Sequence, residues 1–374
     1  MENTINKMIK VLHYAPGFNS GGIESRLLDW YRNIDRTKIK FYLLKLNQID
    51  NSNNLNEFQK MGGEYYNLPS LKMGSVIEYI KKLTLFFKEN KFDVVHVHDL
   101  STGIFVLYAA KKAGISCRIL HSRTTDYLPN EKNVSIKKLL KSLTPSLATD
   151  YFACSYEAGV WGVGEKKASL VKVIKNGIQT DRFHFSEDKR NSIRSKLKID
   201  NKFVIGTIGR LSPQKNLMFL LDVFNQLQHN HSNAVLVIVG EGSMRSEIEN
   251  KVRMYGLNDK VLLLGEQNNV WDYYISFDVF VGTSYYEGFG TTAIESQAAG
   301  TPTVLSTGFP EVVCISNYIT RLSLDLSMDS WADTILNYRG IRFSNESIEL
   351  VEQHGYSAYS VAKELELFYI KQVM

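Results

Sequence analysis

Short apolar runs alternate with longer amphipathic stretches along the chain. The runs are rich in Val, Ile, Leu and Phe and nearly continuous, which is typical of parallel strands covered on both faces. In the first half we predict strands at 10–14, 41–46, 93–97, 117–120, 151–154 and 171–174. In the second half we predict strands at 203–208, 234–239, 261–264, 279–281 and 302–305. Because helical patterns separate these runs, the sequence predicts an α/β fold made of two similar halves.

The length and composition favour two ordinary globular domains. The chain has 374 residues, more than one hydrophobic core usually holds, with 44% hydrophobic and 22% charged residues. The charged, weakly apolar stretch 181–202 lies between the two strand series, and we predict that it connects the domains. We place the first domain at 1–180 and the second at 181–355. The residues of the last helical pattern, 356–374, do not show which of the two domains it packs against.

Charge, cysteines and the amino terminus exclude several classes of protein. The net charge of +5 is spread among many acids and gives no argument for a nucleic-acid partner. The first residues lack the apolar core of a signal peptide, and no stretch reaches the roughly 18 apolar residues of a membrane span, so we expect a cytoplasmic protein. The three cysteines are widely spaced without a C-x-x-C pair, which predicts neither a disulfide framework nor a zinc site.

Open parallel sheets bind ligands beyond the carboxyl ends of their strands, and glycines follow two of these ends. Gly21 and Gly22 precede an amphipathic helix after the first predicted strand. Glycine lets the backbone approach a ligand closely, and a helix amino terminus favours an anion. A glycine-rich helix start without a ligand explains the same motif. Gly240 and Gly242 are explained by a tight turn after the strand at 234–239.

Two cations flank a predicted helix start in the second half. Ser212 and Pro213 fit the cap and first position of a helix, with Lys215 in its first turn and Arg210 just before it. Cations there oppose the helix dipole at a cost of roughly 0.3 to 1 kcal/mol each, and a bound phosphate would reverse the sign. The pair therefore favours an anion site.

The stretch SYYEGFG, at 284–290, presents a carboxylate in a glycine-rich loop. Thr292 and Glu295 fit a capping box at the next helix start, so Glu295 has a purely structural explanation. Glu287 precedes that helix and cannot be a capping-box partner. Carboxylates accept paired hydrogen bonds from vicinal hydroxyls, as on ribose. Phosphate-binding cations and hydroxyl-binding acids along one sheet edge together predict a sugar-nucleotide site.

These segments resemble the retaining GT-B glycosyltransferases of the large bacterial family 4 type, which includes capsule, exopolysaccharide and lipid glycosylation enzymes. The matching segments occur in the expected order, namely SGGIE (20–24), HSR (121–123), KNGIQTDRF (175–183), IGRLSPQKN (208–216), VGEGSMR (239–245) and EGFGTTAIE (287–295). The resemblance implies two Rossmann-like domains facing each other across a cleft, with the acceptor domain first, the donor domain second and helix 356–374 crossing back to the first. It implies a hexosyltransferase that moves a sugar from a nucleotide-activated, UDP-linked donor to a saccharide or lipid-linked saccharide in cell-surface polysaccharide synthesis, with retention.

The resemblance also assigns roles to individual residues. Arg210 and Lys215 would hold the diphosphate and stabilise the leaving nucleotide. Glu295 would bind the ribose, and Glu287 would face the donor sugar. The backbone beside the sugar would come from Gly288, Phe289, Gly290 and Thr291. Gly21 and Gly22 would approach the diphosphate from the other domain.

Two histidines and the absence of a metal motif complete the expected site. His121 would lie near the donor sugar and the acceptor hydroxyl. His98 is a candidate for the acceptor site, although a hydrogen-bonded residue at a strand end explains it as well. Enzymes of this family generally need no metal, and no D-x-D motif occurs in the chain, so we expect no cofactor, with Arg210 and Lys215 in the place of a metal ion.

The segment 135–147 interleaves lysines with Ile and Leu, which fits peripheral contact with an anionic membrane. A surface helix whose leucines face the core fits too, and the shortness of the segment favours that interpretation. Two other functions remain as alternatives. The first is a nicotinamide-dependent oxidoreductase, but the chain lacks the G-x-G-x-x-G motif after its first strand, and this function would leave Arg210 and Lys215 unexplained. The second is a non-catalytic binding protein with the GT-B fold, which would not need every donor-contacting residue, whereas this chain has all of those expected.

Overall fold

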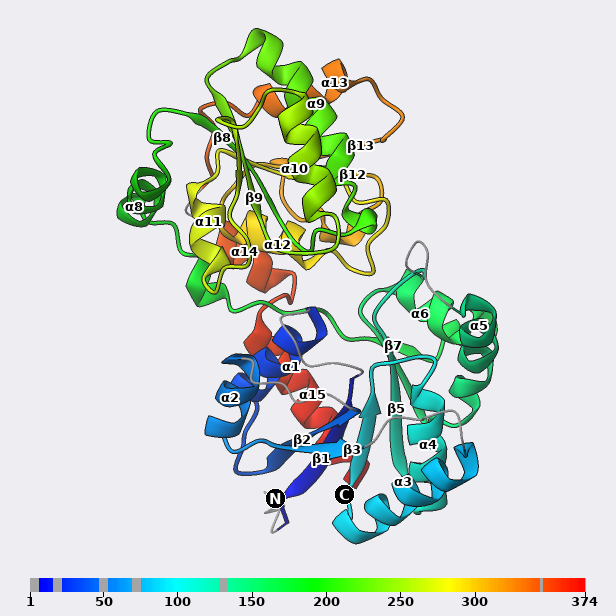
Figure 1. Cartoon of the computed structure of the whole chain (residues 1–374). Coiled ribbons are helices and arrows are strands. Elements are labelled where there is room, and N and C mark those ends of the chain that lie inside the picture. The colour runs from blue at the N-terminus through cyan, green and yellow to red at the C-terminus, as the bar shows by residue number, and fades with distance from the viewer. Residues whose placement is uncertain are drawn as a thin grey trace. The chain divides into compact units, whose positions relative to one another are not determined.

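A computed structural model describes residues 7–15, 22–46, 53–68, 75–127, 133–343 and 346–373 of the chain. The chain divides into two compact units (Figure 1). The first consists of residues up to Gly177 together with 357–374, and the second runs from Ile178 to Tyr356. The predicted boundaries, after 180 and after 355, lie close to these points. None of the helices in the described ranges has the length and apolar character that a membrane span needs.

The first unit contains a parallel sheet of seven strands in the order β3-β2-β1-β4-β5-β6-β7. The strands are β1 (Ile9–Tyr14), β2 (Ile39–Leu46), β3 (Glu64–Leu68), β4 (Val94–Val97), β5 (Cys117–Ser122), β6 (Asp150–Ala153) and β7 (Val171–Val173). The edge strand β3 was not predicted, because its residues are polar or partly exposed. The central strands β1 and β4 are almost wholly buried, as their continuous apolar character predicts.

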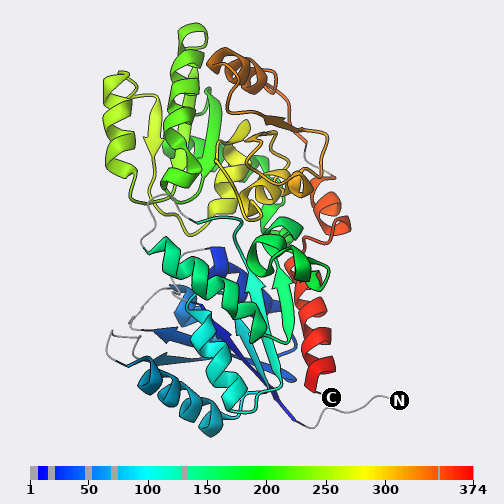
Figure 2. The same cartoon turned by 90° about the vertical axis from the view of Figure 1, so that its right-hand side faces the viewer.

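Helices cover both faces of this sheet. Those before the domain crossing are α1 (Gly22–Asn33), α2 (Asn53–Lys60), α3 (Val76–Asn90), α4 (Gly103–Lys112), α5 (Val134–Leu143), α6 (Tyr156–Val163), α7 (Glu165–Ala168) and the 3-10 turn η1 (Thr144–Ser146). The last helix, α15 (Ala358–Val373), runs beside the same sheet (Figure 2). Val361, Leu365 and Tyr369 of α15 are buried in a core shared with α1 and β1. This packing confirms that the C-terminal helix returns to the first unit.

The second unit contains a parallel sheet of six strands in the order β10-β9-β8-β11-β12-β13. The strands are β8 (Phe203–Ile208), β9 (Ala234–Val239), β10 (Val261–Leu263), β11 (Val279–Gly282), β12 (Thr303–Ser306) and β13 (Ile319–Leu322). The helices are α8 (Glu187–Leu197), α9 (Leu217–Asn230), α10 (Arg245–Met254), α11 (Val270–Ser276), α12 (Thr291–Ala298), α13 (Met328–Leu336) and α14 (Ser347–Gln353). The 3-10 turns are η2 (Thr180–Phe183), η3 (Pro213–Lys215) and η4 (Glu311–Val313). The edge strand β13, half-buried throughout, was not predicted.

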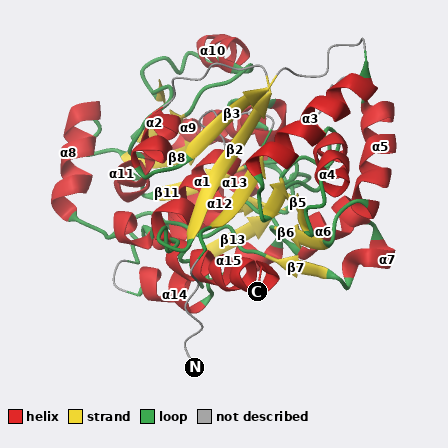
Figure 3. Cartoon of the chain, turned by 90° about the horizontal axis from the view of Figure 1, so that it is seen from below, coloured by secondary structure: helices red, strands yellow, loops and turns green. Residues whose placement is uncertain are grey.

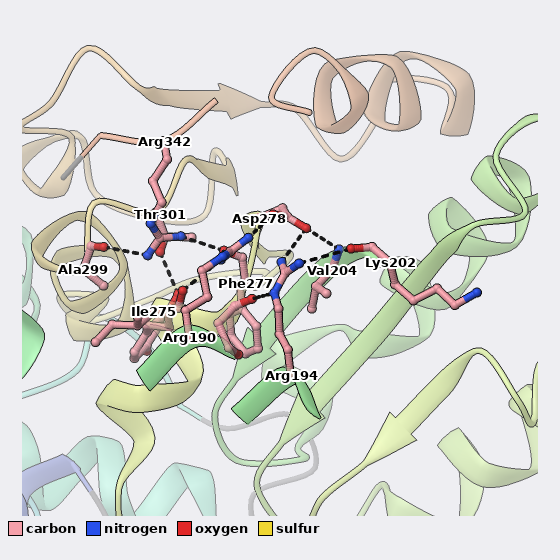
Figure 4. A network of polar contacts seen from close by, with 12 residues as sticks. Arg190, Arg194, Lys202, Val204, Ile275, Phe277, Asp278, Ala299, Thr301 and Arg342 are labelled. Atoms are coloured by element: carbon pink, nitrogen blue, oxygen red, sulfur yellow. Dashed lines mark hydrogen bonds and ion pairs between the residues drawn. The ribbon is translucent and has the colours of Figure 1, made fainter. Parts of the chain in front are cut away.

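The stretch 181–202 is part of the second unit, so the prediction that it connects the domains is wrong. Its helix α8 is bound to the sheet by two arginines (Figure 4). Arg190 and Arg194 each form an ion pair with a different oxygen of Asp278, whose Oδ2 also accepts the Val204 amide at 2.7 Å. Arg342 donates to the Phe277 carbonyl beside them. The charges that suggested a solvated linker therefore make specific hydrogen bonds.

Candidate active site

Two of the predicted site residues form an ion pair at the carboxyl edge of the second sheet. Nζ of Lys215 lies 2.6 Å from Oε1 of Glu287, and the Ser284 hydroxyl donates to the same oxygen at 2.6 Å. The Lys215 side chain is 21% exposed and the Glu287 side chain 10%. Residues from two separate sequence motifs therefore meet, with their charges still within reach of solvent.

Lys215 belongs to a 3-10 turn and not to the first turn of a long helix. Ser212 is extended and makes no side-chain cap, and η3 is followed by Asn216, whose φ of 50° is left-handed. The α-helix begins only at Leu217, so the predicted start at Ser212 and Pro213 is wrong. The Thr283 hydroxyl donates to the carbonyls of Lys215 and Asn216, at 3.1 Å each, which ties this turn to the end of β11.

The loop that carries Glu287 is held from both sides. The Glu287 amide donates to the Gly308 carbonyl at 2.9 Å, and Gln214 donates to the Tyr286 carbonyl at 2.8 Å. A Cβ at Gly308 would lie 2.3 Å from the Ser284 carbonyl oxygen, so this close approach requires glycine. The neighbouring strands and turns therefore preset the position of the carboxylate.

Glu295 lies one turn into α12 and accepts a hydrogen bond from the Tyr274 hydroxyl at 2.9 Å. The expected capping box does not form. The cap position is Gly290, with a φ of 84° and no side-chain hydrogen bond, so Thr292 is already inside the helix. Phe289 is 3% exposed and packs on the ring of Tyr356. Its side chain is therefore core, and only its backbone can face a ligand.

Arg210 is exposed directly after β8 and lines a pocket together with Lys215, Ser284 and Thr292. The pocket lies at the sheet edge where nucleotide-binding folds take their ligands. Gly240, after β9, has a φ of 138°, and a Cβ there would lie 2.0 Å from the Gly209 carbonyl oxygen. The glycine after β9 therefore allows the loop after β8 to pack closely beside it.

Histidines gather at the carboxyl ends of β1, β4 and β5 in the first unit. His13, His96 and His121 are fully buried, and His98 is 4% exposed. His96 Nε2 lies 2.9 Å from His121 Nδ1, and His13 Nδ1 lies 3.1 Å from His98 Nε2. Sequence reasoning selected His98 and His121 and missed His13 and His96. Each of the missed residues follows an apolar run within a predicted strand, which was the available signal.

Burial keeps these imidazoles neutral. Desolvation, with the charge of Arg123 adding to it, lowers the pKa of His13 to about 3. The same causes, with the neighbouring imidazoles, hold the pKa values of His96, His98 and His121 well below the usual 6.5. Burial also lowers the pKa of Arg123 to about 10, which leaves its guanidinium charged at neutral pH.

Gly22 is the first residue of α1, and Gly21 lies outside the described residues. Of the predicted site, the structure thus brings Arg210, Lys215 and Glu287 to one edge of the second sheet, with Glu295 on the adjoining helix. His98 and His121 lie together in the first unit.

Two units that each contain a parallel sheet are the architecture of the GT-B fold, and comparison with known proteins shows a transferase of this class. Residues 188–338 match the family model described as "Glycosyl transferases group 1". The chain is 31% identical over 359 residues to "Putative glycosyltransferase EpsF" of Bacillus subtilis (strain 168), covering 93% of each protein. The chain therefore belongs to the group 1 glycosyltransferases.

Two further similarities bear on fold and function. The chain is 29% identical over 244 residues to "UDP-Gal:alpha-D-GlcNAc-diphosphoundecaprenol alpha-1,3-galactosyltransferase" of Escherichia coli, covering 62% of this chain and 63% of that protein. The structure of Anabaena Alr3699/HepE in complex with UDP-glucose superposes with a TM-score of 0.73 at 19% identity, over 98% of both chains. Membership of a glycosyltransferase family, the GT-B fold and transferase activity are confirmed, which removes the oxidoreductase alternative.

Proposed function

We propose that the protein transfers a sugar from a UDP-sugar to a saccharide or lipid-linked saccharide in cell-surface polysaccharide synthesis, with retention of configuration. The observation that carries the proposal is the Lys215–Glu287 pair beside Arg210 at the carboxyl edge of the second sheet. A cation for phosphate and a carboxylate for hydroxyls are placed within one ligand's reach. The relative from Escherichia coli is named for a UDP-linked donor and a lipid-diphosphate acceptor, which supports both partner classes.

In this proposal Arg210 and Lys215 bind the donor diphosphate and stabilise the charge that develops on the leaving nucleotide. Glu287 accepts hydrogen bonds from donor-sugar hydroxyls, with the backbone of 288–291 beside it. Glu295 binds the ribose, and the Tyr274 hydroxyl orients its carboxylate. Gly21 and Gly22 contribute backbone to the diphosphate site, and His121 contacts the donor sugar. We leave His98 out of the acceptor site, because its ring nitrogens already face His13 and Arg123.

We further propose that the reaction needs no divalent metal ion. Two cationic side chains at the diphosphate position supply the charge that magnesium supplies elsewhere. Transfer measured in excess EDTA should equal transfer in added magnesium. A requirement for added magnesium would refute this part of the proposal and leave the choice of donor untouched.

The test of donor binding is UDP affinity of the Lys215→Ala variant, measured by calorimetry. We expect binding at least tenfold weaker than in the unchanged protein, because a charge-assisted phosphate contact contributes roughly 1.5 to 3 kcal/mol. Lys189→Ala, an exposed lysine of α8, is the matched control and should bind UDP normally. Unchanged affinity in Lys215→Ala would remove the phosphate role. A parallel thermal-shift series with UDP, GDP and ADP tests which nucleotide base the donor site prefers.

We also propose that α3, α4 and α5 rest on an anionic membrane. These helices lie side by side on the first unit (Figure 3). They carry eight lysines and two glutamates, an excess of six positive charges, whereas the whole chain has a net charge of +5. None of the residues of α5 is buried, whereas Leu140 is half-buried and Leu147, just beyond the helix, packs against the core, so the expectation that the leucines of 135–147 face the core holds only in part. Exposed apolar side chains of the three helices are Val76, Ile77, Leu85, Tyr108, Ile136, Leu139 and Leu143.

Flotation with liposomes containing phosphatidylglycerol tests the membrane proposal. The double variant Lys137→Glu, Lys138→Glu should bind such liposomes far less than the unchanged protein, because each lysine near an anionic surface contributes about 1 kcal/mol. The control, Lys189→Glu with Lys196→Glu, reverses two exposed lysines of α8 and should still float. Absence of binding by the unchanged protein at low salt would refute the proposal.

A further inference from the structure

The four buried histidines of the first unit form two separate hydrogen-bonded pairs. One pair joins His13 to His98, and the other joins His96 to His121. The rings of His96 and His121 are stacked with their centroids 5.1 Å apart. The second ring nitrogens of His13 and His121, both Nε2, are buried without a hydrogen-bond partner among the described residues. Each neutral imidazole has one donor and one acceptor nitrogen, so the partners at the ends of the pairs decide the tautomers.

Arg123 decides the tautomer of the first pair. Its Nε lies 3.4 Å from His98 Nδ1 and its Nη1 donates to Asn176 at 2.7 Å. A guanidinium can only donate, so His98 Nδ1 is an acceptor and His98 carries its hydrogen on Nε2. That hydrogen is donated to His13 Nδ1, and His13 therefore also carries its hydrogen on Nε2.

Tyr369 of α15 stands at the end of the second pair, with its hydroxyl 2.8 Å from His96 Nδ1. Burial raises the pKa of Tyr369 well above 10, so the hydroxyl keeps its hydrogen. If the hydroxyl donates, His96 Nε2 donates to His121 Nδ1, and only the hydrogen on His121 Nε2 lacks a partner. If His96 Nδ1 donates to the hydroxyl instead, the hydroxyl hydrogen has no other acceptor among the described residues. His121 Nε2 is then an acceptor without a donor, so two polar groups lack a partner. The first arrangement leaves fewer buried polar groups unsatisfied and is preferred.

We infer that Tyr369 and His96 are positioning residues that hold His121 as the Nε2–H tautomer. His121 then offers a hydrogen-bond donor, and it cannot act as a general base through that nitrogen. The ligand atom that suits it is an oxygen with a lone pair, such as a sugar hydroxyl oxygen. The inference rests on the proposed contact of His121 with the donor sugar, and it adds the direction of that hydrogen bond and two residues that set it.

A shared metal ion is the competing explanation for the cluster, since ring nitrogens of His13, His96 and His98 lie within 4.8 Å of one another. A histidine ligand normally donates its other N–H to an acceptor. His98 Nδ1 faces the Arg123 guanidinium, which cannot accept, and His96 Nε2 faces His121. The positive charge of Arg123 would also oppose a cation. The surroundings therefore favour a network of neutral hydrogen bonds.

Nitrogen-15 NMR of the full chain with labelled histidine measures the tautomers directly. Long-range proton–nitrogen correlations distinguish Nε2–H from Nδ1–H rings, and His121→Gln assigns the His121 signals. We expect His121 as Nε2–H in the unchanged protein and a mixture of tautomers in Tyr369→Phe, which keeps the ring and loses only the hydroxyl. An Nδ1–H ring in the unchanged protein overturns the inference without any variant. An unchanged spectrum in Tyr369→Phe removes the role of Tyr369.

Kinetics separate this inference from the proposed function. In Tyr369→Phe, kcat/KM for the donor should fall in proportion to the Nε2–H fraction that NMR measures, because only that fraction is competent to bind. A purely structural role of Tyr369 would lower stability without this proportionality. If His121→Ala retains normal transfer, the proposed contact of His121 fails while the tautomer assignment is judged by NMR alone. If transfer depends on His121 and the ring is Nδ1–H, the inference fails and the contact stands.

Discussion

Mild acid should destabilise the first unit far more than the second. The cause is the cluster of His13, His96, His98 and His121, which is buried and neutral. In the unfolded chain each of these rings titrates near pH 6.5. Because the folded pKa values are depressed, the unfolded state binds more protons below pH 6.5. Stability is therefore complete above that pH and falls as the pH drops toward the folded pKa, which for His13 is about 3.

The magnitude follows from the unfolded pKa. At pH 5.5 an unfolded histidine is about tenfold more often protonated than neutral, so each ring that stays neutral in the fold costs about 1.4 kcal/mol of stability. Four such rings give a loss of about 5 kcal/mol between pH 7.5 and pH 5.5. That loss is comparable with the whole stability of many domains, about 5 to 15 kcal/mol.

Backbone hydrogen exchange followed by mass spectrometry gives the free energy of opening for each unit separately. Peptides from β1, β4 and β5 should lose about 5 kcal/mol of protection over these two pH units, after correction for intrinsic exchange. Peptides from β8 and β9 are the internal control, because the histidines of the second unit lie at exposed or half-exposed positions. A loss below about 1.5 kcal/mol in the first unit, the share of one ring, would contradict a fully neutral cluster. His13→Gln should remove about a quarter of the pH dependence.

Three further outcomes are expected in the second unit. Glu287→Gln should abolish sugar transfer with only a small change in melting temperature, and near-normal turnover would show that the carboxylate does not serve the donor sugar. Asp278→Ala leaves Arg190 and Arg194 without their carboxylate and should lower the free energy of unfolding by about 3 kcal/mol in urea titration, whereas a loss below about 1 kcal/mol would mean that solvent replaces the pair. Gly240→Ala places a Cβ against the Gly209 carbonyl at a φ of 138° and should destabilise by about 2 kcal/mol, whereas Gly256→Ala, at a φ of 66° with open space around it, should cost less by thermal melting.

The sequence predicts the buried part of this fold well and its edges poorly. Strands β8 and β9 have the predicted bounds because their residues are continuously apolar. The edge strands Glu64–Leu68 and Ile319–Leu322 contain polar residues and have no buried position, so they lack that pattern. The charged stretch 181–202 was misinterpreted for a related reason, since two of its arginines are specific partners of Asp278 and a charge pattern does not reveal its partner.

The candidate site shows the same division. Glu287, Arg210 and Lys215 were selected because the local structure predicted around them gave no structural reason for their charges. The histidine network was not, since strand alternation places His96 and His98 on one face but does not tell that β1 and β5 flank β4. Tyr369 joins the network from the far end of the chain. Contacts set by strand order and by the return of α15 could not be derived from local pattern.

The Lys215–Glu287 pair changes the physical basis of the anion site. The sequence argument relied on a helix dipole, but Lys215 lies in a 3-10 turn and its charge is balanced by a carboxylate at 2.6 Å. The two side chains are only 21% and 10% exposed, so a ligand that separates them has to supply a new partner for each charge. In the proposed function the donor does so, because its diphosphate replaces Glu287 beside Lys215 and its sugar hydroxyls replace Lys215 beside Glu287. Donor binding and placement of the carboxylate are on this view one coupled exchange of partners, so Glu287→Gln should tighten UDP binding slightly while transfer is lost.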